Sequence, residues 1–227
     1  MGRLKKMIKA LADEKIGKNT LRYEQLDSTA KYISFDIFDT LVFRTSGEPR
    51  SVFALLEKQL GIKDFAARRI SAEKRAREKK QGREVTLREI YRSFDGISEN
   101  LARKLCQKEF ETELDVCRPN RRFTQLYKKC AANRKVILIS DMYLTSDMLS
   151  KILENCGITG YEKLYISSEA DASKRSGSLY RYVLNDLKIK PCELLHIGND
   201  LITDYICAKR QGVRCIKIKT QRRPSRK

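Results

Sequence analysis

Acidic, hydroxyl and lysine side chains follow several short apolar segments of the sequence, at the points where those segments end. They are Asp36 with Asp39 and Thr40, Ser140 with Asp141, Lys174 shortly after Ser167-Ser168, and Asp200 with Asp204. Carboxylates that converge on one rim repel one another unless a cation compensates for their charge. Together with the hydroxyls and the lysine, they suit a divalent cation and a phosphate group. Taken singly, each residue has a plainer explanation, such as capping the following helix, but their occurrence at successive segment ends favours a site.

The apolar segments that precede these residues are predicted β-strands. They cover 32–35, 135–139, 164–166, 194–197 and 213–219. Amphipathic stretches between them predict helices over 121–133, over 146–156, after Gly177 and up to about Gln211. This alternation predicts an α/β fold with a Rossmann-like parallel sheet and helices on both faces. Ligands of such sheets bind beyond the carboxyl ends of the strands, where the chemistry-bearing residues stand.

The connection between the first two strands is unusually long. Roughly a hundred residues separate them, whereas a crossover with its helix needs only about a dozen or somewhat more. An α-helical cap inserted over 45–118 is therefore predicted, with helices at 51–60, 64–80, 87–94 and 98–116 and a return hinge at Pro119-Asn120. The core then comprises 31–44 and 119–220, an N-terminal helical extension covers 1–30, and a basic tail covers 221–227.

Four segments, taken in order, resemble the four motifs of the haloacid dehalogenase (HAD) superfamily of hydrolases. They are Phe35-Asp36-Ile37-Phe38-Asp39-Thr40-Leu41, Ile137-Leu138-Ile139-Ser140-Asp141, Lys174, and His196-Ile197-Gly198-Asn199-Asp200 with Asp204. The resemblance covers about 31–220 and looks most like the predicted HAD hydrolases that accompany bacterial surface-polysaccharide glycosyltransferases. It implies a HAD-like core with a helical cap after the first strand.

The resemblance also implies a role for each motif residue. Asp36 would be the nucleophile and form an aspartyl phosphate that water hydrolyses. Mg²⁺ would be the cofactor, held by Asp36, the Phe38 carbonyl, Asp200 and, directly or through orientation, Asp204. Lys174 would neutralise charge on the nucleophile and on the transferring group.

Four further residues are candidates for contact with the substrate. Ser140, with neighbouring backbone amides, would donate hydrogen bonds to phosphoryl oxygens, and Thr40 and Asp141 stand beside the same motifs. Arg44, just beyond the first motif, would reach a substrate anion, and a structural ion pair is an equally good interpretation of its position.

Two positions depart from the phosphatase pattern. Phe38 stands where HAD phosphatases usually carry a second aspartate as general acid and base, and an aromatic residue there resembles the metal-independent dehalogenase branch. Asp39, one residue further on, is a candidate replacement for that acid and base, with turn capping as the alternative. Asn199 stands where glycine usually precedes the metal-binding aspartate. The only histidine, His196, lies within an apolar strand and is expected to be a satisfied core residue.

Composition narrows the class of protein. The chain has 227 residues, 41% of them hydrophobic and 34% charged, as in a globular domain of ordinary size with a modest insertion. No apolar run approaches the roughly 18 residues of a membrane span. The net charge of +19 directs attention to nucleic acid. However, the excess lies in the tail and on one mixed helix face without an RNA-binding or zinc-finger pattern, so nucleic acid is not an expected partner.

Cysteine usage and the N-terminus predict the compartment. The seven cysteines are scattered without paired spacing, and no apolar secretory segment follows the first residues. Both observations predict a reduced, cytoplasmic location.

The sequence as a whole predicts a Mg²⁺-dependent HAD-type phosphohydrolase that acts on a small phosphorylated metabolite, such as a sugar phosphate. Two alternatives stay open at this point. One is a catalytically weak HAD-like binding module that partners a glycosyltransferase, and the other is a metal-independent hydrolase of the dehalogenase type.

Overall fold

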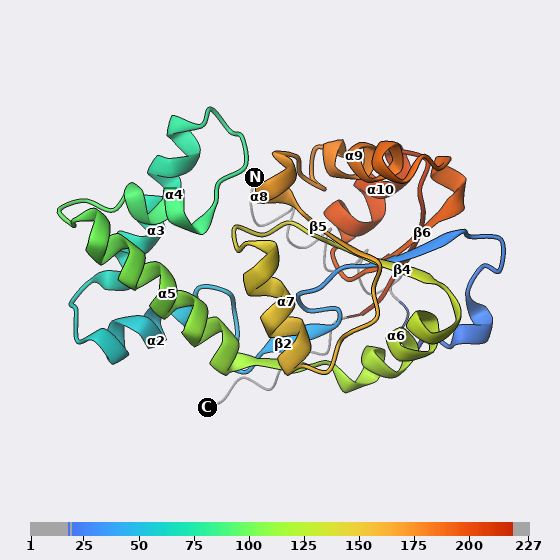
Figure 1. Ribbon diagram of the computed structural model, residues 1–227, viewed down its shortest axis with the longest axis horizontal. Coiled ribbons are helices and arrows are strands. Elements are labelled where there is room, and N and C mark those ends of the chain that lie inside the picture. Colours follow the sequence, from blue (N-terminus) through green and yellow to red (C-terminus); the bar gives the residue numbers. More distant parts are fainter. Residues whose placement is uncertain (1–17, 19, 220–227) are drawn as a thin grey trace, which may run out of the picture.

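A five-stranded parallel sheet forms the centre of the computed structural model, which describes residue 18 and residues 20–219 (Figure 1). Its strands are β1 (Tyr32–Phe35), β4 (Lys135–Ser140), β5 (Lys163–Ile166), β6 (Leu194–Gly198) and β7 (Arg214–Lys217), in the order β5-β4-β1-β6-β7. All neighbouring strands run parallel. The predicted α/β class is thereby confirmed, and the order reverses at β1, which pairs with β4 on one side and β6 on the other.

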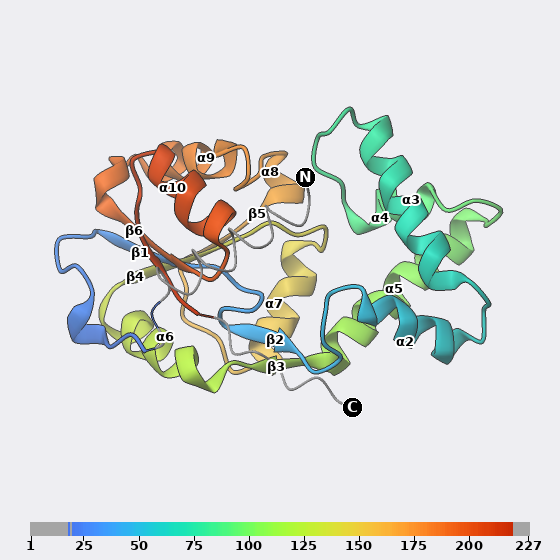
Figure 2. The same cartoon turned by 180° about the vertical axis from the view of Figure 1, so that it is seen from behind.

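The two faces of the sheet are buried under different helices, as the alternation of side chains along β4 shows. Val136 and Leu138 pack into the core beneath α6 (Arg121–Asn133) and α7 (Ser146–Asn155). Ile137 and Ile139 pack on the opposite face with α9 (Ser178–Leu187) and α10 (Cys207–Arg210), which the two views show on the other side of the sheet (Figures 1 and 2). Burial on both faces explains why the strands read as continuous apolar runs.

The cap is a separate helical lobe beside the core (Figures 1 and 2). It contains α2 (Ser51–Leu60), α3 (Phe65–Lys79), α4 (Leu87–Arg92) and α5 (Glu99–Val116). Local signals set its boundaries: Gly61 ends α2 with a φ of 64°, and the Thr86 hydroxyl caps α4 by accepting from the Glu89 backbone N–H at 3.3 Å. The predicted cap helices are found within two residues of their expected ends.

A two-stranded antiparallel sheet connects the cap to the core, and the sequence did not indicate it. β2 (Val42–Arg44) precedes the cap and β3 (Cys117–Pro119) follows it, with Arg44 opposite Cys117 and Val42 opposite Pro119. Strands of three residues carry too little alternation to be recognised. Their pairing brings the entry and the exit of the cap together, beside the end of β1.

The predicted N-terminal helical extension is wrong for the described part of 1–30. Only a short 3-10 helix, η1 (Tyr23–Gln25), forms there, and Lys18 pairs with Ile218 in a parallel bridge. Leu21 and Leu26 are buried in the core, whereas an exposed helix was expected, and the residues on which that expectation rested, Leu4, Met7, Ile8 and Leu11, lie outside the described residues. Residues 1–17, residue 19 and the predicted basic tail over 221–227 lie outside the described residues.

The cap touches the core through the segment between α3 and α4. The Leu87 N–H donates to the Tyr143 carbonyl at 2.8 Å, the Ser167 hydroxyl donates to Glu84 at 3.0 Å, and Arg83 forms an ion pair with Asp171. These contacts place the cap over the side of the core that carries the ends of β4 and β5.

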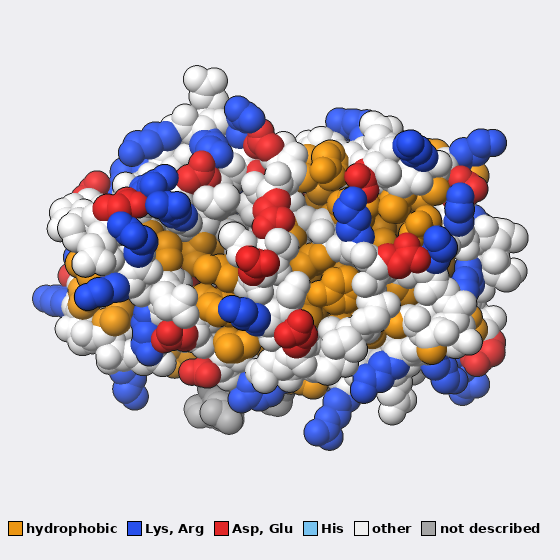
Figure 3. All heavy atoms as spheres, viewed as in Figure 1, with side chains coloured by type: hydrophobic (Ala, Val, Ile, Leu, Met, Phe, Trp, Pro, Cys, Tyr) orange, Lys and Arg blue, Asp and Glu red, His pale blue; other side chains and the backbone are white. Residues whose placement is uncertain are grey.

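None of the helices in the described residues combines the length and the apolar character that crossing a bilayer requires. On the face shown in Figure 3, lysine and arginine side chains are spread over both lobes with acidic side chains among them. The basic excess therefore does not gather into one patch on that face.

Candidate active site

The carboxyl ends of β1, β4 and β6 bring most of the predicted residues to one edge of the sheet. Asp36 directly follows β1, Ser140 ends β4, and Asn199 and Asp200 directly follow β6. In the sheet, Phe35 lies beside Leu138 on one side and beside Ile197 on the other, so the three chain segments leave the sheet together. Because the strand order reverses at β1, this edge is the place where open α/β sheets bind ligands.

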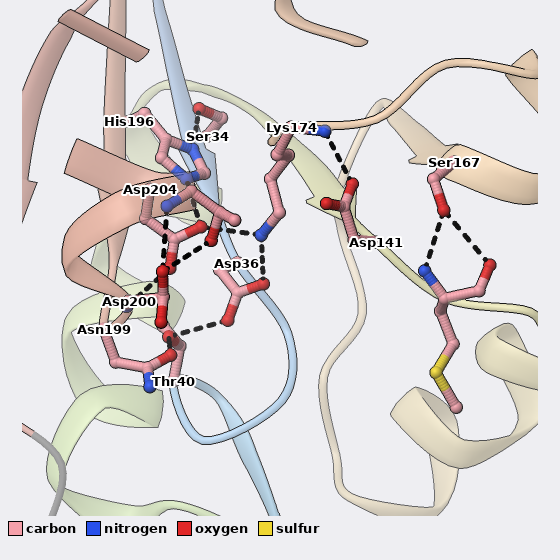
Figure 4. A network of polar contacts seen from close by, with 12 residues as sticks. Ser34, Asp36, Thr40, Asp141, Ser167, Lys174, His196, Asn199, Asp200 and Asp204 are labelled. Carbon is pink, nitrogen blue, oxygen red and sulfur yellow. Dashed lines mark hydrogen bonds and ion pairs between the residues drawn. The ribbon is translucent and has the colours of Figure 1, made fainter. Parts of the chain in front are cut away.

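Lys174 joins two of the predicted carboxylates (Figure 4). Its Nζ lies 2.6 Å from Asp36 Oδ1 and 2.6 Å from Asp204 Oδ1, and all three side chains are less than a tenth exposed. Burial alone would lower the pKa of Lys174, but the two carboxylates outweigh burial and raise its pKa well above the ordinary value. A charged lysine therefore occupies the space between the two aspartates.

The electrostatics differ at the two carboxylates. Burial raises the pKa of Asp36 to about 7, which the positive charge of Lys174 partly offsets and the negative charge of Asp204 reinforces. Asp204 is buried as well, yet Lys174 and a hydrogen bond from His196 hold its pKa below the usual range. The surroundings of Asp204 thus favour its charged form beside Lys174, while burial disfavours the charged form of Asp36.

Asp204 is held by hydrogen bonds on both oxygens. Oδ2 accepts from the Asp200 N–H at 2.8 Å, and Oδ1 lies 3.3 Å from His196 Nε2. His196 Nδ1 lies 2.8 Å from the Ser34 hydroxyl, so the tautomer with the proton on Nε2 donates to Asp204 and accepts from Ser34. His196 is fully buried between these partners, which agrees with the expected core histidine.

Gly198 makes the approach of Asp204 to β6 sterically feasible. A Cβ at this position would lie 2.4 Å from Asp204 Cγ and 2.6 Å from its Cβ. Only glycine allows the carboxylate to reach the Asp200 N–H at this distance.

Asp200 begins a widened helical turn. Its Oδ1 accepts from the backbone N–H groups of Ile202 at 2.9 Å and Thr203 at 2.8 Å, at the start of the π-helix η3 (Leu201–Ile206). The capping role that the sequence left as the plainer explanation is therefore present. Wide π-turns are frequent at functional sites, and here the turn places Asp204 under Asp200.

Asn199 has its side chain next to the nucleophile candidate. Its amide lies 3.0 Å from the Thr40 hydroxyl, and its nitrogen reaches Asp36 Oδ2 at 3.3 Å and the Phe38 carbonyl at 3.2 Å when it faces them. The sequence had marked Asn199 only as a departure from the family pattern. The side chains of adjacent residues after a strand point in different directions. The spacing of residues in the sequence therefore did not reveal that the Asn199 side chain faces the end of β1.

Three predicted substrate-binding residues lie at the same edge in supporting positions. The Thr40 hydroxyl donates to Asp36 Oδ2 at 2.9 Å, and Asp141 Oδ1 accepts from the Lys174 backbone N–H at 2.8 Å. Ser140 is buried at the end of β4. Their contact with a substrate stays a prediction, but Thr40 and Asp141 also orient the nucleophile and the lysine.

Arg44 and Asp39 have structural positions. Arg44 is buried and forms a bidentate ion pair with Glu113, the alternative that the sequence had left open, and its Cζ lies 4.0 Å from the Phe38 ring centroid. Asp39 has a φ of 61°, and its N–H closes a turn onto the Val42 carbonyl at 2.7 Å. A catalytic role for Asp39 stays a prediction.

The cap contributes a residue that the sequence did not suggest. Glu84 accepts from Ser167 Oγ, which in turn accepts from the Met142 N–H at 3.0 Å in the loop after β4. Burial raises the pKa of Glu84, partly offset by the Ser167 hydrogen bond. Its distance of 83 residues from Ser167 in the chain left no local signal.

The residues at this edge of the sheet do not fit the Mg²⁺ site that was predicted from the sequence. Asp36 and Asp204 meet at a lysine, both oxygens of Asp204 accept hydrogen bonds, and Oδ1 of Asp200 caps a helix. Among residue 18 and residues 20–219, no group of three or more histidine, cysteine, aspartate or glutamate side chains is arranged to hold a metal ion. No step of the chemistry below is therefore routed through a metal.

Comparison with known proteins adds to this geometry. No protein-family model and no curated protein matches the sequence. Among solved structures, a haloacid dehalogenase-like hydrolase of Xanthomonas campestris is similar with a TM-score of 0.61 and 17% identity, over 92% of this chain and 89% of that one. A 2-haloacid dehalogenase of Pseudomonas syringae pv. tomato gives 0.60 and 15%, over 82% and 85%.

A third similar structure is YfnB of Bacillus subtilis, described as a HAD hydrolase and solved bound to magnesium. Its TM-score is 0.58 at 13% identity, over 83% of this chain and 88% of that one. The chain has the HAD-like fold. The structural similarity establishes the HAD-like fold of the core with its cap. At identities of 13–17% it carries no information about the substrate or the cofactor of this chain.

Proposed function

We propose that the chain is a HAD-type hydrolase in which the Asp36 carboxylate attacks the substrate and forms a covalent intermediate that water then cleaves. The observation that carries the proposal is the placement of Asp36 at the reversal of the strand order, 2.6 Å from Lys174 Nζ. Lys174 stabilises the ionised carboxylate that a nucleophile requires, and Thr40 donates to its other oxygen.

Lys174 would serve the reaction in two ways. Its positive charge favours ionisation of Asp36 against the effect of burial, and it offsets negative charge that develops beside the nucleophile. Asp204, hydrogen-bonded by His196 and the Asp200 N–H, holds the ammonium group in place. Asp204 is therefore a positioning residue in this scheme.

A phosphate ester is the substrate class that the ordered motifs support. The sequence predicts Mg²⁺ as the cofactor of such a reaction, but the residues at this site do not fit that ion, because Lys174 lies between Asp36 and Asp204. The charge balance at the site weighs against binding a phosphate without such a cation. Asp36 and Asp204 carry two negative charges against the single positive charge of Lys174, and a phosphate monoester would add more.

An organic halide is the second substrate class, and two observations favour it. Phe38 places an aromatic residue where phosphatases of this fold usually carry an acid, and similar structures are 2-haloacid dehalogenases. In that reaction Asp36 would displace halide from carbon, and water would attack the resulting alkyl ester at its carbonyl carbon. The ester would then release an alcohol and regenerate the Asp36 carboxylate.

One labelling experiment separates the two classes. Purified protein is incubated with a panel of phosphate esters and 2-haloacids in ¹⁸O-water, with Mg²⁺ or with a chelator. Water attacks phosphorus in an aspartyl phosphate, so ¹⁸O would appear in released phosphate. It attacks the carboxyl carbon in an alkyl ester, so ¹⁸O would appear in the peptide that contains Asp36.

Matched variants test the proposal itself. Asp36→Asn should abolish turnover of any substrate found, and activity that survives this substitution would refute Asp36 as the nucleophile. Asp39→Asn tests the predicted acid and base next to it. A folded protein with no turnover across the panel would instead support the binding-module alternative, for which capture of a glycosyltransferase is the corresponding prediction.

A further inference from the structure

We infer that the Asn199 side chain occupies the position beside the nucleophile that a divalent cation would need, so that this chain orients Asp36 with an amide and a lysine. The inference deepens the proposed function and rests on Asp36 being the nucleophile. It assigns Asn199 as a positioning residue.

Three oxygens converge on the Asn199 amide, and Figure 4 shows Asn199 beside Thr40 and Asp36. They are Asp36 Oδ2 at 3.3 Å, the Phe38 carbonyl at 3.2 Å and Thr40 Oγ1 at 3.0 Å. The first two are the carboxylate and the carbonyl that the sequence had predicted as ligands of Mg²⁺. A side chain whose nitrogen lies near both leaves no room for an ion between them, because Mg²⁺ requires its ligands at about 2.1 Å.

The hydrogen bonds of the neighbours determine which end of the amide faces them. A carboxylate oxygen and a backbone carbonyl only accept, and the Thr40 hydroxyl already gives its proton to Asp36 Oδ2 at 2.9 Å. With its oxygen inward, the amide would face the lone pairs of Asp36 and Phe38. With its nitrogen inward, the amide directs its two N–H groups at oxygens that can accept, so this orientation is the favourable one.

The neighbouring acids are engaged elsewhere. Asp200 Oδ1 accepts from two backbone N–H groups of η3, and Asp204 accepts from Lys174 and from the Asp200 N–H. The Asp200 carboxylate therefore caps η3 with Oδ1, and the preceding residue, Asn199, contacts Asp36. A neutral amide donates there instead, and Lys174 supplies the positive charge.

This arrangement predicts that exchanging one atom of residue 199 creates a cation site. In Asn199→Asp a carboxylate would face Asp36 Oδ2 and the Phe38 carbonyl, giving three oxygen groups on one point. Without metal the two carboxylates would repel each other, so the variant should lose thermal stability and recover it when the ion binds.

The experiment measures Mn²⁺ binding to the full chain by electron paramagnetic resonance of the free ion, with thermal unfolding in parallel. Wild-type protein should bind Mn²⁺ weakly at this site, and Asn199→Asp at least about tenfold more tightly, because an added carboxylate ligand raises cation affinity. Mn²⁺ should raise the Tm of Asn199→Asp and leave that of the wild type unchanged. Asp200→Asn is the control. It neutralises the adjacent acid, and this variant should bind Mn²⁺ as weakly as the wild type.

Tight wild-type binding that Asp36→Asn or Asp200→Asn removes would overturn the inference. Equal, weak binding by wild type and by folded Asn199→Asp would overturn it as well. If Asn199→Asp does not fold, the exchanged pair Asn199→Asp/Asp200→Asn, which keeps the net charge, provides the same comparison. Because these readouts need no substrate, they are independent of the ¹⁸O experiment, and either proposal can fail while the other stands.

Discussion

The Glu113 carboxylate on cap helix α5 receives two hydrogen bonds from the Arg44 guanidinium on strand β2. Arg44 Nε lies 2.7 Å from Oε2 and Nη2 lies 3.0 Å from Oε1. Both side chains are buried, and the Arg44 guanidinium also lies 4.0 Å from the centre of the Phe38 ring, two residues after the nucleophile. The ion pair thus connects the cap to the loop that carries Asp36.

Breaking this pair from one side should be costly. Arg44→Met leaves the Glu113 charge buried without its partner, and Glu113→Gln does the same to Arg44. Each substitution should therefore lower the free energy of unfolding by about 3–5 kcal/mol. The double variant should cost much less than the sum of the two single changes. Urea unfolding of all four proteins measures the coupling, and a coupling energy below about 0.5 kcal/mol would contradict a direct interaction.

Lys174→Met should remove activity and destabilise the protein. The substitution leaves the Asp36 and Asp204 carboxylates buried without the lysine that lies 2.6 Å from each, at an expected cost of about 3–5 kcal/mol. Urea unfolding at neutral pH measures this cost. The matched control is Lys174→Met/Asp204→Asn, which removes one of the two charges and should regain part of the stability but none of the turnover. A single variant as stable as the wild type would show that the three groups are not charged as described.

Gly198→Ala should displace Asp204. The added Cβ would lie within 2.6 Å of three atoms of that side chain, so either Asp204 or the end of β6 must move, at a cost of about 1–3 kcal/mol. Turnover should fall with stability, because Asp204 positions Lys174. Gly157→Ala is the comparison: its φ of 66° imposes backbone strain, but no atom lies within 4 Å of the new Cβ. Equal losses in activity for the two variants would argue against a specific role of Gly198.

His196 should remain neutral through the weakly acidic range. Burial lowers its pKa below the ordinary value of 6.5, although the hydrogen bond to Asp204 acts in the opposite direction. The unfolded chain therefore takes up a proton before the folded one, and this residue reduces the free energy of unfolding as the pH falls below about 6.5. Since the chain has one histidine, its proton NMR signal can be followed directly. His196→Gln should remove this part of the pH dependence, and a signal that titrates at or above 6.5 in the folded protein would contradict the prediction.

The sequence was most informative where burial leaves a continuous pattern. The strands of the main sheet, the helices around it and the cap helices were recognisable, because apolar residues recur with the spacing that each element must bury. The segment over 20–30 was misjudged for a different reason. The predicted helix rested on the spacing of Leu4, Met7, Ile8 and Leu11, which lie outside the described residues, and it was extended to residue 30 without such spacing there. Leu21 and Leu26 instead pack against the core from an irregular segment.

The sequence by itself determined which residue types stand at the sheet edge, because parallel strands end at a common edge whatever the details of packing. It could not determine the partners. Lys174 meets Asp36 across 138 positions of the chain, and Arg44 meets Glu113 across 69. Only the tertiary structure therefore decided that the lysine lies between two aspartates and that the arginine forms its ion pair with a cap residue. It also decided that Asn199 faces the nucleophile while Asp200 caps η3. This difference between the two residues depends on the direction in which the chain leaves β6. Packing of the π-turn against the sheet sets that direction, and residue spacing in the sequence does not reveal it.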